Sequence, residues 1–346
     1  MERLPLLRER RHQDLVLQRK NDFIVELGSP DYRPNTQTSV KNVNFALYVG
    51  AIGDYICHCV ALKWIFDTQP HVRGTIYAPD YFIEIPMHLF HNKKGWKVLP
   101  REALTEDVIR LNPTFIPSHD TVLNGTGTHL VDLGFVYFAN RHHAPSGCYY
   151  PKLDLDYTNI AHSLPNKYVV LTPGATDENR EMPPKLFNLI QDHVLAKGLM
   201  PVYLGKAFMT KCHITKFSES YDLSKGINLI EKTSLLEAAK IMASAKMVIG
   251  LDNGLLHLAA CTSVPIIFGY NVIGPEYRRP RRPDECITID IFPDKAQLPC
   301  TFCMSEMRFF FGHNFKKCIY KDNECLNWFD RNPNLWTQAV DKILCQ

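Results

Sequence analysis

The strongest constraint on the fold is a repeated pattern in which a short apolar run ends at glycine or a polar turn and a helix-like segment follows. These apolar runs occur at 44–50, 74–79, 95–100, 167–175, 200–205, 247–252, 265–270 and 286–291. Segments with helical periodicity lie between them, at 56–66, 183–198 and 234–245, and a terminal helix is expected at 333–345. This alternation predicts an α/β fold in two halves of similar size, each a doubly wound parallel sheet with helices on both faces.

The predicted domain boundary is a polar, proline-flanked stretch at 149–157, where the pattern breaks. We therefore expect an N-terminal extension at 1–40, one Rossmann-like domain at 41–160 and a second at 161–330, with a terminal helix at 331–346. Ligands of such sheets bind beyond the carboxyl ends of the strands. The loops after residues 50, 173 and 251 are thus where chemistry is expected.

Composition excludes several classes of protein. The chain has 346 residues, of which 45% are apolar and 22% charged, which favours a buried core over disorder. Its net charge of +3 does not by itself indicate a nucleic-acid partner. No apolar run is long enough to cross a membrane, and the charged N-terminus is unlike a secretory signal. We therefore expect no transmembrane segment, a cytoplasmic location and cysteines that are mostly thiols, while a peripheral membrane contact stays open.

The segment with the most chemical character is Asp252-Asn253-Gly254, followed by His257 in the first turn of a small-residue helix. Asp252 or Asn253 can cap this helix, and the remaining backbone N–H groups and the helix dipole attract an anion. Gly254 would let a phosphate approach the backbone, and His257 could donate to it. The alternative is a capped buried helix with a satisfied histidine. The strand–turn–helix context favours a diphosphate site.

A second loop of the same half has phosphate-binding character. The strand at 168–172 ends in Pro173-Gly174-Ala175, followed by Thr176 and Arg180. A glycine turn, a hydroxyl and a guanidinium suit a phosphate, which arginine binds bidentately. The alternative is an ordinary strand-to-helix loop with a solvated arginine.

The first half carries a candidate general base. Gly50 and Gly53 form a turn after the first strand, and Asp54 follows at the start of a helix. Asp54 could be only a helix cap, the commoner use of aspartate there. In the functional interpretation its carboxylate takes a proton from an acceptor hydroxyl.

The C-terminal cysteines form a candidate structural zinc site. Cys300, Cys303, Cys318 and Cys325 surround His313 in a loop-like segment. Four thiolates, or three with His313, could hold zinc. Plain packed thiols and a disulfide are the alternatives. By contrast, Cys57-His58-Cys59 is too tightly spaced for a ligand set and is predicted to be core.

The arginine-rich run at 277–283 has two interpretations. It is either a solvated loop or a lining for the path of an anionic acceptor.

The segment 234–270 closely resembles the hallmark segment of glycosyltransferase family 9, the heptosyltransferase family, in which a strand leads to Asp-(Ser/Thr/Asn)-Gly-x-x-His. Gly53-Asp54, Pro173-Gly174-Ala175 and the segment with Cys300, Cys303, Gly312, His313 and Cys318 match further motifs of the family. The resemblance covers most of 44–320. Arg180 stands where the family usually has lysine, and Cys325 is extra.

This resemblance implies a GT-B fold and an inverting glycosyltransferase that moves a sugar from a nucleotide-diphosphate sugar to an acceptor hydroxyl, with no cofactor required for catalysis. It implies an acceptor-side domain at 41–160 and a nucleotide-sugar domain with a cysteine-containing cap at 161–330. Asp54 is then the base. The implied donor-binding residues are Gly53, Gly174, Ala175, Thr176, Arg180, Asp252, Asn253, Gly254 and His257. The acceptor is a saccharide, a glycolipid or a modified base in DNA; the rival interpretations are an inactive nucleotide-sugar-binding module and a nucleic-acid-binding protein.

Overall fold

The structure is a computed structural model with two compact units. It describes residues 41–47, 51–70, 72–91, 93–103, 109–111, 129, 131–132, 134–135, 143–156, 162–175, 178–206, 209–210, 213–214, 221–303, 318 and 323–346. The first unit comprises the described residues within Met1–Val49, Cys57–Thr114 and Leu130–Cys148, and the second those within Gly50–Ile56, Phe115–His129 and Tyr149–Gln346. The second unit therefore includes a short piece of chain that precedes most of the first.

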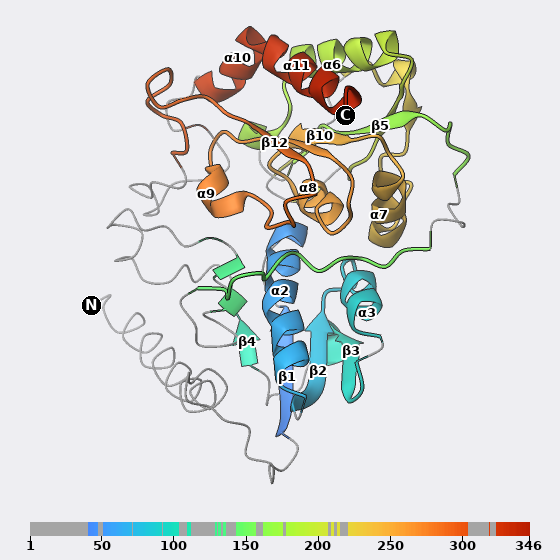
Figure 1. Ribbon diagram of the computed structural model, residues 1–346, viewed down its shortest axis with the longest axis vertical. Coiled ribbons are helices and arrows are strands. Elements are labelled where there is room, and N and C mark those ends of the chain that lie inside the picture. Colours follow the sequence, from blue (N-terminus) through green and yellow to red (C-terminus); the bar gives the residue numbers. More distant parts are fainter. Residues whose placement is uncertain are drawn as a thin grey trace. The chain divides into compact units, whose positions relative to one another are not determined.

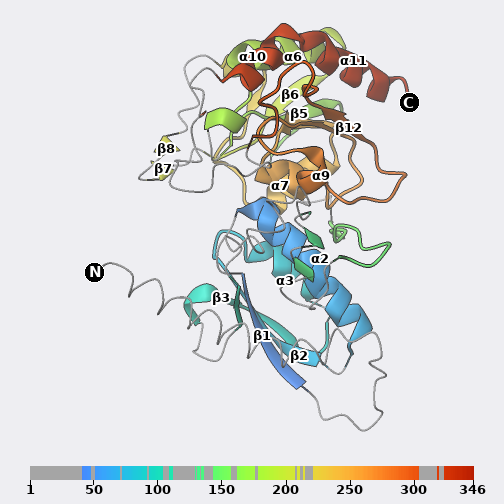
Figure 2. The same ribbon diagram turned by 90° about the vertical axis from the view of Figure 1, so that its left-hand side faces the viewer.

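The first unit contains a four-stranded parallel sheet in the order β3-β2-β1-β4. Its strands are β1 (Lys41–Leu47), β2 (Val72–Ala78), β3 (Trp96–Pro100) and β4 (Ile109–Leu111), and its helices are α2 (Ile52–Thr68), α3 (Glu84–Phe90) and a 3-10 turn at Arg101–Ala103. The register places Phe45 opposite Ile76 on one side and Ile109 on the other. Helix α2 lies along one face of this sheet (Figure 2).

Helix α2 carries apolar side chains on nearly all sides, and most of them are buried. Cys57, His58 and Cys59 are at most 1% exposed, which confirms that this cluster belongs to the core. Burial raises the pKa of the Cys59 thiol far above its usual value, with a further contribution from Cys57. These side chains therefore pack as small neutral groups rather than as ligands.

The second unit contains a six-stranded parallel sheet in the order β12-β11-β10-β5-β6-β9 (Figure 1). Its strands are β5 (Tyr168–Thr172), β6 (Met200–Tyr203), β9 (Ile227–Asn228), β10 (Val248–Leu251), β11 (Ile266–Gly269) and β12 (Thr288–Ile291). Strands β5, β10 and β11 are buried along their whole length, as expected of a sheet covered on both faces. A separate antiparallel pair is formed by β7 (Met209–Thr210) and β8 (His213–Ile214).

Helices cover both faces of the larger sheet. They are α6 (Pro184–Ala196), α7 (Leu235–Ala243), α8 (Gly254–Ala259), α9 (Pro275–Arg278), α10 (Glu324–Arg331) and α11 (Pro333–Leu344), with 3-10 turns at Glu178–Arg180 and Leu223–Lys225. Helices α6, α10 and α11 lie on one side and α7 and α8 on the other (Figure 1). Trp336 of α11 is fully buried in the core with Phe187 and Phe329.

Most predicted elements of the second half are present. Helix α7, predicted at 234–245, begins after Ser234, whose hydroxyl accepts the N–H of Glu237 at 3.3 Å, as in a capping box. The terminal helix is α11, whereas α10 was not predicted. The predicted N-terminal extension at 1–40 lies outside the described residues.

The segment 149–156, predicted as the linker, has no helix or strand and packs on the second unit. The N–H of Tyr150 donates to the Arg281 carbonyl and that of Leu153 to the Cys261 carbonyl, both at 2.8 Å. From residue 151 to 156 buried and exposed side chains alternate, as in an extended strand. The first unit ends at Cys148 and the second resumes at Tyr149, where this predicted linker begins.

Among the helices in the described part of the chain, none combines the length and the apolar character needed to cross a bilayer.

Candidate functional site

The candidate site begins where β5 and β10 end side by side. Asn253 is the N-cap of α8, since its side-chain oxygen accepts the N–H groups of Leu255 and Leu256 at 3.0 and 3.2 Å. Its amide nitrogen donates to the carbonyl and the hydroxyl oxygen of Thr172, both at 3.1 Å. The cap therefore also ties α8 to the end of β5. Gly250 makes this approach possible, because a Cβ there would lie 2.1 Å from the Thr172 hydroxyl oxygen.

Asp252 is a buried carboxylate surrounded by positive charge. One oxygen accepts from Arg180 Nη1 at 3.2 Å, and the other lies 3.5 Å from His257 Nε2. Burial alone would raise the pKa of Asp252, but its contact with His257 and the charges of Arg180 and Arg278 outweigh burial and hold this pKa well below the usual range. Asp252 is therefore ionised and keeps Arg180 in place.

His257 is 2% exposed and is held from one side. Its Nδ1 forms a 2.8 Å hydrogen bond with the hydroxyl of Tyr150, which is 5% exposed. Its buried Nε2 has no hydrogen-bond partner, because the 3.5 Å approach to Asp252 lacks hydrogen-bond geometry. A buried ring nitrogen in this state is available to a ligand oxygen that reaches it.

The start of α2 packs against this histidine within the second unit. A Cβ on Gly53 would lie 2.6 Å from His257 Cδ2, and a Cβ on Gly254 would lie 2.9 Å from the Cβ of Ile52. Both glycines are therefore required for close packing between α2 and α8. The absence of a side chain at Gly254 thus makes room for Ile52, and the approach of a phosphate to its backbone stays a prediction.

Asp54 is the third residue of α2 rather than its N-cap. Its carboxylate accepts the N–H of Ala51 at 2.8 Å, the reciprocal contact of a capping box. The other oxygen pairs with Arg278 Nη1 at 3.0 Å. The side chain of Asp54 is 20% exposed, so it is partly accessible while it makes both contacts.

The loop after β5 brings Arg180 to the site. Gly174 and Ala175 follow β5 directly, and the 3-10 turn at Glu178–Arg180 precedes α6. The side-chain amide of Asn271 donates to the carbonyl of Asn179 and fixes this turn. Thr176 lies outside the described residues.

The arginine run is not a solvated loop, because its members have different structural partners. Arg278 pairs with Asp54 and Arg279 with Asp290, the latter at 2.8 Å. Arg282 is buried and donates to the carbonyls of Thr262, Val264 and Ile287 at 2.7–3.0 Å. This run thus braces the β11–β12 connection and contributes one cation to the candidate site.

Three of the C-terminal cysteines lie close enough to Cys325 to affect its ionisation. Burial, and to a smaller extent the charges of Cys303, Cys300 and Cys318, raise the pKa of the Cys325 thiol to about 12. Within the described ranges, no group of three or more metal-ligand side chains is placed to hold an ion. His313 lies outside those ranges.

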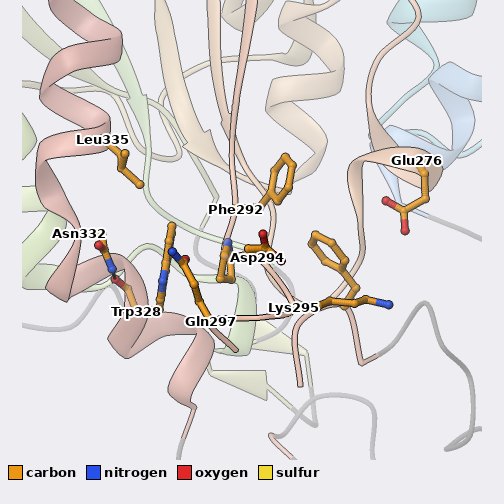
Figure 3. Close-up of a pocket in the computed structure, with 10 residues that line it drawn as sticks. Glu276, Phe292, Asp294, Lys295, Gln297, Trp328, Asn332 and Leu335 are labelled. Atoms are coloured by element: carbon orange, nitrogen blue, oxygen red, sulfur yellow. Dashed lines mark hydrogen bonds between the residues drawn. The ribbon is translucent and has the colours of Figure 1, made fainter. Parts of the chain in front are cut away.

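A separate hollow of about 550 Å³ lies beyond the end of β12 (Figure 3). Phe292, Phe302 and Trp328 supply aromatic surface, and Asp294 and Gln297 supply polar groups. Glu276 of α9 also lines it, two residues from Arg278. No local pattern predicted this hollow, because its lining comes from three distant segments.

Three residues of the candidate site were not among those predicted: Tyr150, Thr172 and Arg278. Thr172 is the one polar residue of an otherwise apolar strand, which was a usable signal. Arg278 belonged to a run already singled out. Tyr150 lies in the segment predicted as the domain boundary, where no motif marked it as a site residue.

A sequence model of glycosyltransferase family 9 (heptosyltransferase) matches residues 139–297. No curated protein sequence matches the chain significantly.

Solved structures share the fold. The dodecameric iron-containing heptosyltransferase TibC of enterotoxigenic E. coli, in complex with ADP-D-β-D-heptose, aligns with 90% of this chain and 80% of its own at 14% identity, with a TM-score of 0.66. A family 9 glycosyltransferase of Veillonella parvula aligns with 90% of this chain and 99% of its own at 12% identity, with a TM-score of 0.60. The ADP-heptose LPS heptosyltransferase II of E. coli covers 88% and 99% at 14% identity, with a TM-score of 0.56.

These likenesses give the fold as GT-B, with two Rossmann-like domains. The family match includes the carboxyl ends of β5 and β10, where Arg180, Asp252 and His257 meet. The chain is therefore similar in sequence to glycosyltransferase family 9 (heptosyltransferase) over residues 139–297 and similar in fold to solved heptosyltransferases.

Proposed function

We propose that this protein is an inverting glycosyltransferase, which moves a sugar from a nucleoside-diphosphate sugar to an acceptor hydroxyl. The observation that carries the proposal is the group formed by Arg180, Asp252 and His257 at the ends of β5 and β10. It combines a fixed cation with a buried imidazole nitrogen that lacks a hydrogen bond. Both groups suit the oxygens of a diphosphate.

The donor in this proposal is bound by the two loops of the second unit. Arg180 contacts the diphosphate, and His257 Nε2 donates to one of its oxygens. Gly174, Ala175 and Thr176 line the loop beside it, while Asp252 and Asn253 position Arg180 and α8. TibC was crystallised with ADP-D-β-D-heptose, so an ADP-sugar is the first donor to test.

The chemical step needs a base and a stabilised leaving group. Asp54 takes the proton of the acceptor hydroxyl, and the oxygen attacks the anomeric carbon from the face opposite the diphosphate. The bond between that carbon and the phosphate oxygen breaks, and its electron pair leaves with the nucleoside diphosphate. The fixed charge of Arg180 stabilises the growing negative charge without reorganisation. A single displacement inverts the anomeric configuration.

We also propose a structural metal at the C-terminal cysteines. Cys300, Cys303 and Cys318 lie close enough to Cys325 to raise its pKa, and a set of four thiolates would favour zinc or iron. In their described positions no three of them surround one ion, so metal binding would have to draw the sulfurs together. TibC is described as iron-containing. The metal would fix the cap and take no part in transfer.

The first test is calorimetric binding of ADP, UDP, GDP and CMP to the full chain, with and without EDTA. We expect EDTA-insensitive binding of one nucleoside diphosphate. His257→Ala should weaken that binding about tenfold, since it removes one hydrogen bond to a charged group. His193→Ala is the matched control, because His193 pairs with Asp341 on the α6–α11 surface. Equal affinity in the two variants would remove His257 from the donor site.

The rival functions give different outcomes. An inactive binding module would bind the nucleotide but transfer no sugar to any saccharide or glycolipid acceptor. An enzyme acting on a modified base in DNA would also bind duplex DNA with a steep salt dependence. If no nucleotide binds, the proposed donor site is refuted.

A further inference from the structure

Arg278 is placed to affect both the proposed base, Asp54, and the donor-loop residue Asp252. It is the last residue of α9, and its Nη1 lies 3.0 Å from Asp54 Oδ1. The two side chains are 22% and 20% exposed, so a ligand can reach this ion pair. Both residues belong to the second unit.

The charge of Arg278 also reaches Asp252. It is one of three groups that lower the pKa of that carboxyl, together with His257 and Arg180. Asp252 is paired with Arg180 and approached by His257, and Asp54 forms its ion pair with Arg278. Arg278 therefore lies in the field of the residue that fixes the donor loop while it contacts the proposed base.

A guanidinium has five N–H donors and binds phosphate bidentately, so a diphosphate competes well with one carboxylate oxygen. A carboxylate that faces a guanidinium is also a poor proton acceptor, because protonation must work against the neighbouring charge. Asp54 would become an effective base only when Arg278 turns away from it.

We infer that Arg278 is a further donor-binding residue, whose ion pair with Asp54 opens when the donor diphosphate binds. This inference rests on the proposed function and deepens it. The donor thereby gains a second cation, and the base is released at the moment when the leaving group is in place. Before the donor binds, the same ion pair with Arg278 keeps Asp54 from accepting a proton.

The test is a calorimetric cycle with ADP as the probe, on the full chain. Asp54→Asn removes the competing charge, so ADP should bind about three- to fivefold more tightly than to the wild type. Arg278→Gln should weaken ADP binding about tenfold. In the double variant the gain from Asp54→Asn should vanish, because there is no guanidinium left to release. A merely structural role of Arg278 would not remove that gain.

The matched control is Arg279→Gln. Arg279 is the next residue and pairs with Asp290 at 2.8 Å, with its side chain 53% exposed. This variant should bind ADP as the wild type does. Asp54→Ser is a second variant that keeps an acceptor for the Ala51 N–H if Asp54→Asn unfolds α2.

Two results would overturn the inference alone: ADP binding to Arg278→Gln that equals binding to Arg279→Gln, or an Asp54→Asn gain that persists in the double variant. Wild-type protein that binds none of the nucleoside diphosphates would instead refute the proposed function, and the inference with it.

Discussion

The hydrogen bond between Tyr150 and His257 gives a sharp test of how the site is held. Tyr150→Phe removes one hydroxyl and leaves His257 Nδ1 without its 2.8 Å partner, in a place where the two residues are only 5% and 2% exposed. The buried Nε2 already lacks a hydrogen bond, so both ring nitrogens would be unsatisfied. A neutral hydrogen bond contributes about 1 kcal/mol, and a stranded buried nitrogen adds to the cost. We expect a loss of about 1–2 kcal/mol in the free energy of unfolding.

The assay is thermal and urea unfolding of the full chain, with Tyr149→Phe as the matched control. Tyr149 is the preceding residue and is 43% exposed, so its hydroxyl should contribute almost nothing. For a unit of this size the expected loss lowers Tm by about 2–8 °C. ADP affinity should fall as well, because the imidazole loses the contact that orients it. If the two variants unfold alike and bind ADP alike, the hydrogen bond does not hold the site.

Three further predictions concern Asp54, Asp252 and the C-terminal cysteines. Asp54→Asn should lower the rate of sugar transfer about 100- to 10,000-fold, the usual loss for a general base, and leave ADP bound at least as tightly; transfer at the wild-type rate would exclude Asp54 as the base. Because the pKa of Asp252 is lowered in the folded chain, its stabilising contribution is complete above about pH 4 and is lost as the pH falls through the lowered value. Asp252→Asn should therefore be less stable at pH 7 and show a flatter loss of stability below pH 4 in urea titrations, whereas parallel curves for the two proteins would contradict this. Protein purified without chelators should contain about one zinc or iron per chain by elemental analysis, and Cys325→Ser should lose it while Cys345→Ser, whose thiol is exposed, keeps it.

The sequence was informative wherever a local pattern is enough. The order of strands and helices in the second unit follows from apolar periodicity and from caps such as Ser234, because these signals act over a few neighbouring residues. The small amphipathic helix α10 was missed because it is only eight residues long and follows a loop-like, cysteine-containing segment.

The candidate site was predictable only in part. Arg180, Asp252 and His257 were found because they follow buried strands, where parallel sheets place their ligands. Their partners were not, since Tyr150 and Arg278 come from segments far away in the chain whose contacts no local pattern encodes. At Gly254 the sequence suggested space for a phosphate next to the backbone. It did not predict the contact with the side chain of Ile52.

Each of the two units is built from separate stretches of the chain, and this limits how the protein can be divided into fragments. Because Gly50–Ile56 belongs with Tyr149–Gln346, no cut at a single peptide bond yields the second unit whole. A fragment that begins at Tyr149 keeps Tyr150, Arg180 and Asp252 but lacks Gly53 and Asp54. It would therefore lose both the proposed base and the segment that packs against His257 and α8. If two relatives exchanged their N-terminal and C-terminal halves, the proposed base Asp54 would come from one parent and the rest of the second unit from the other.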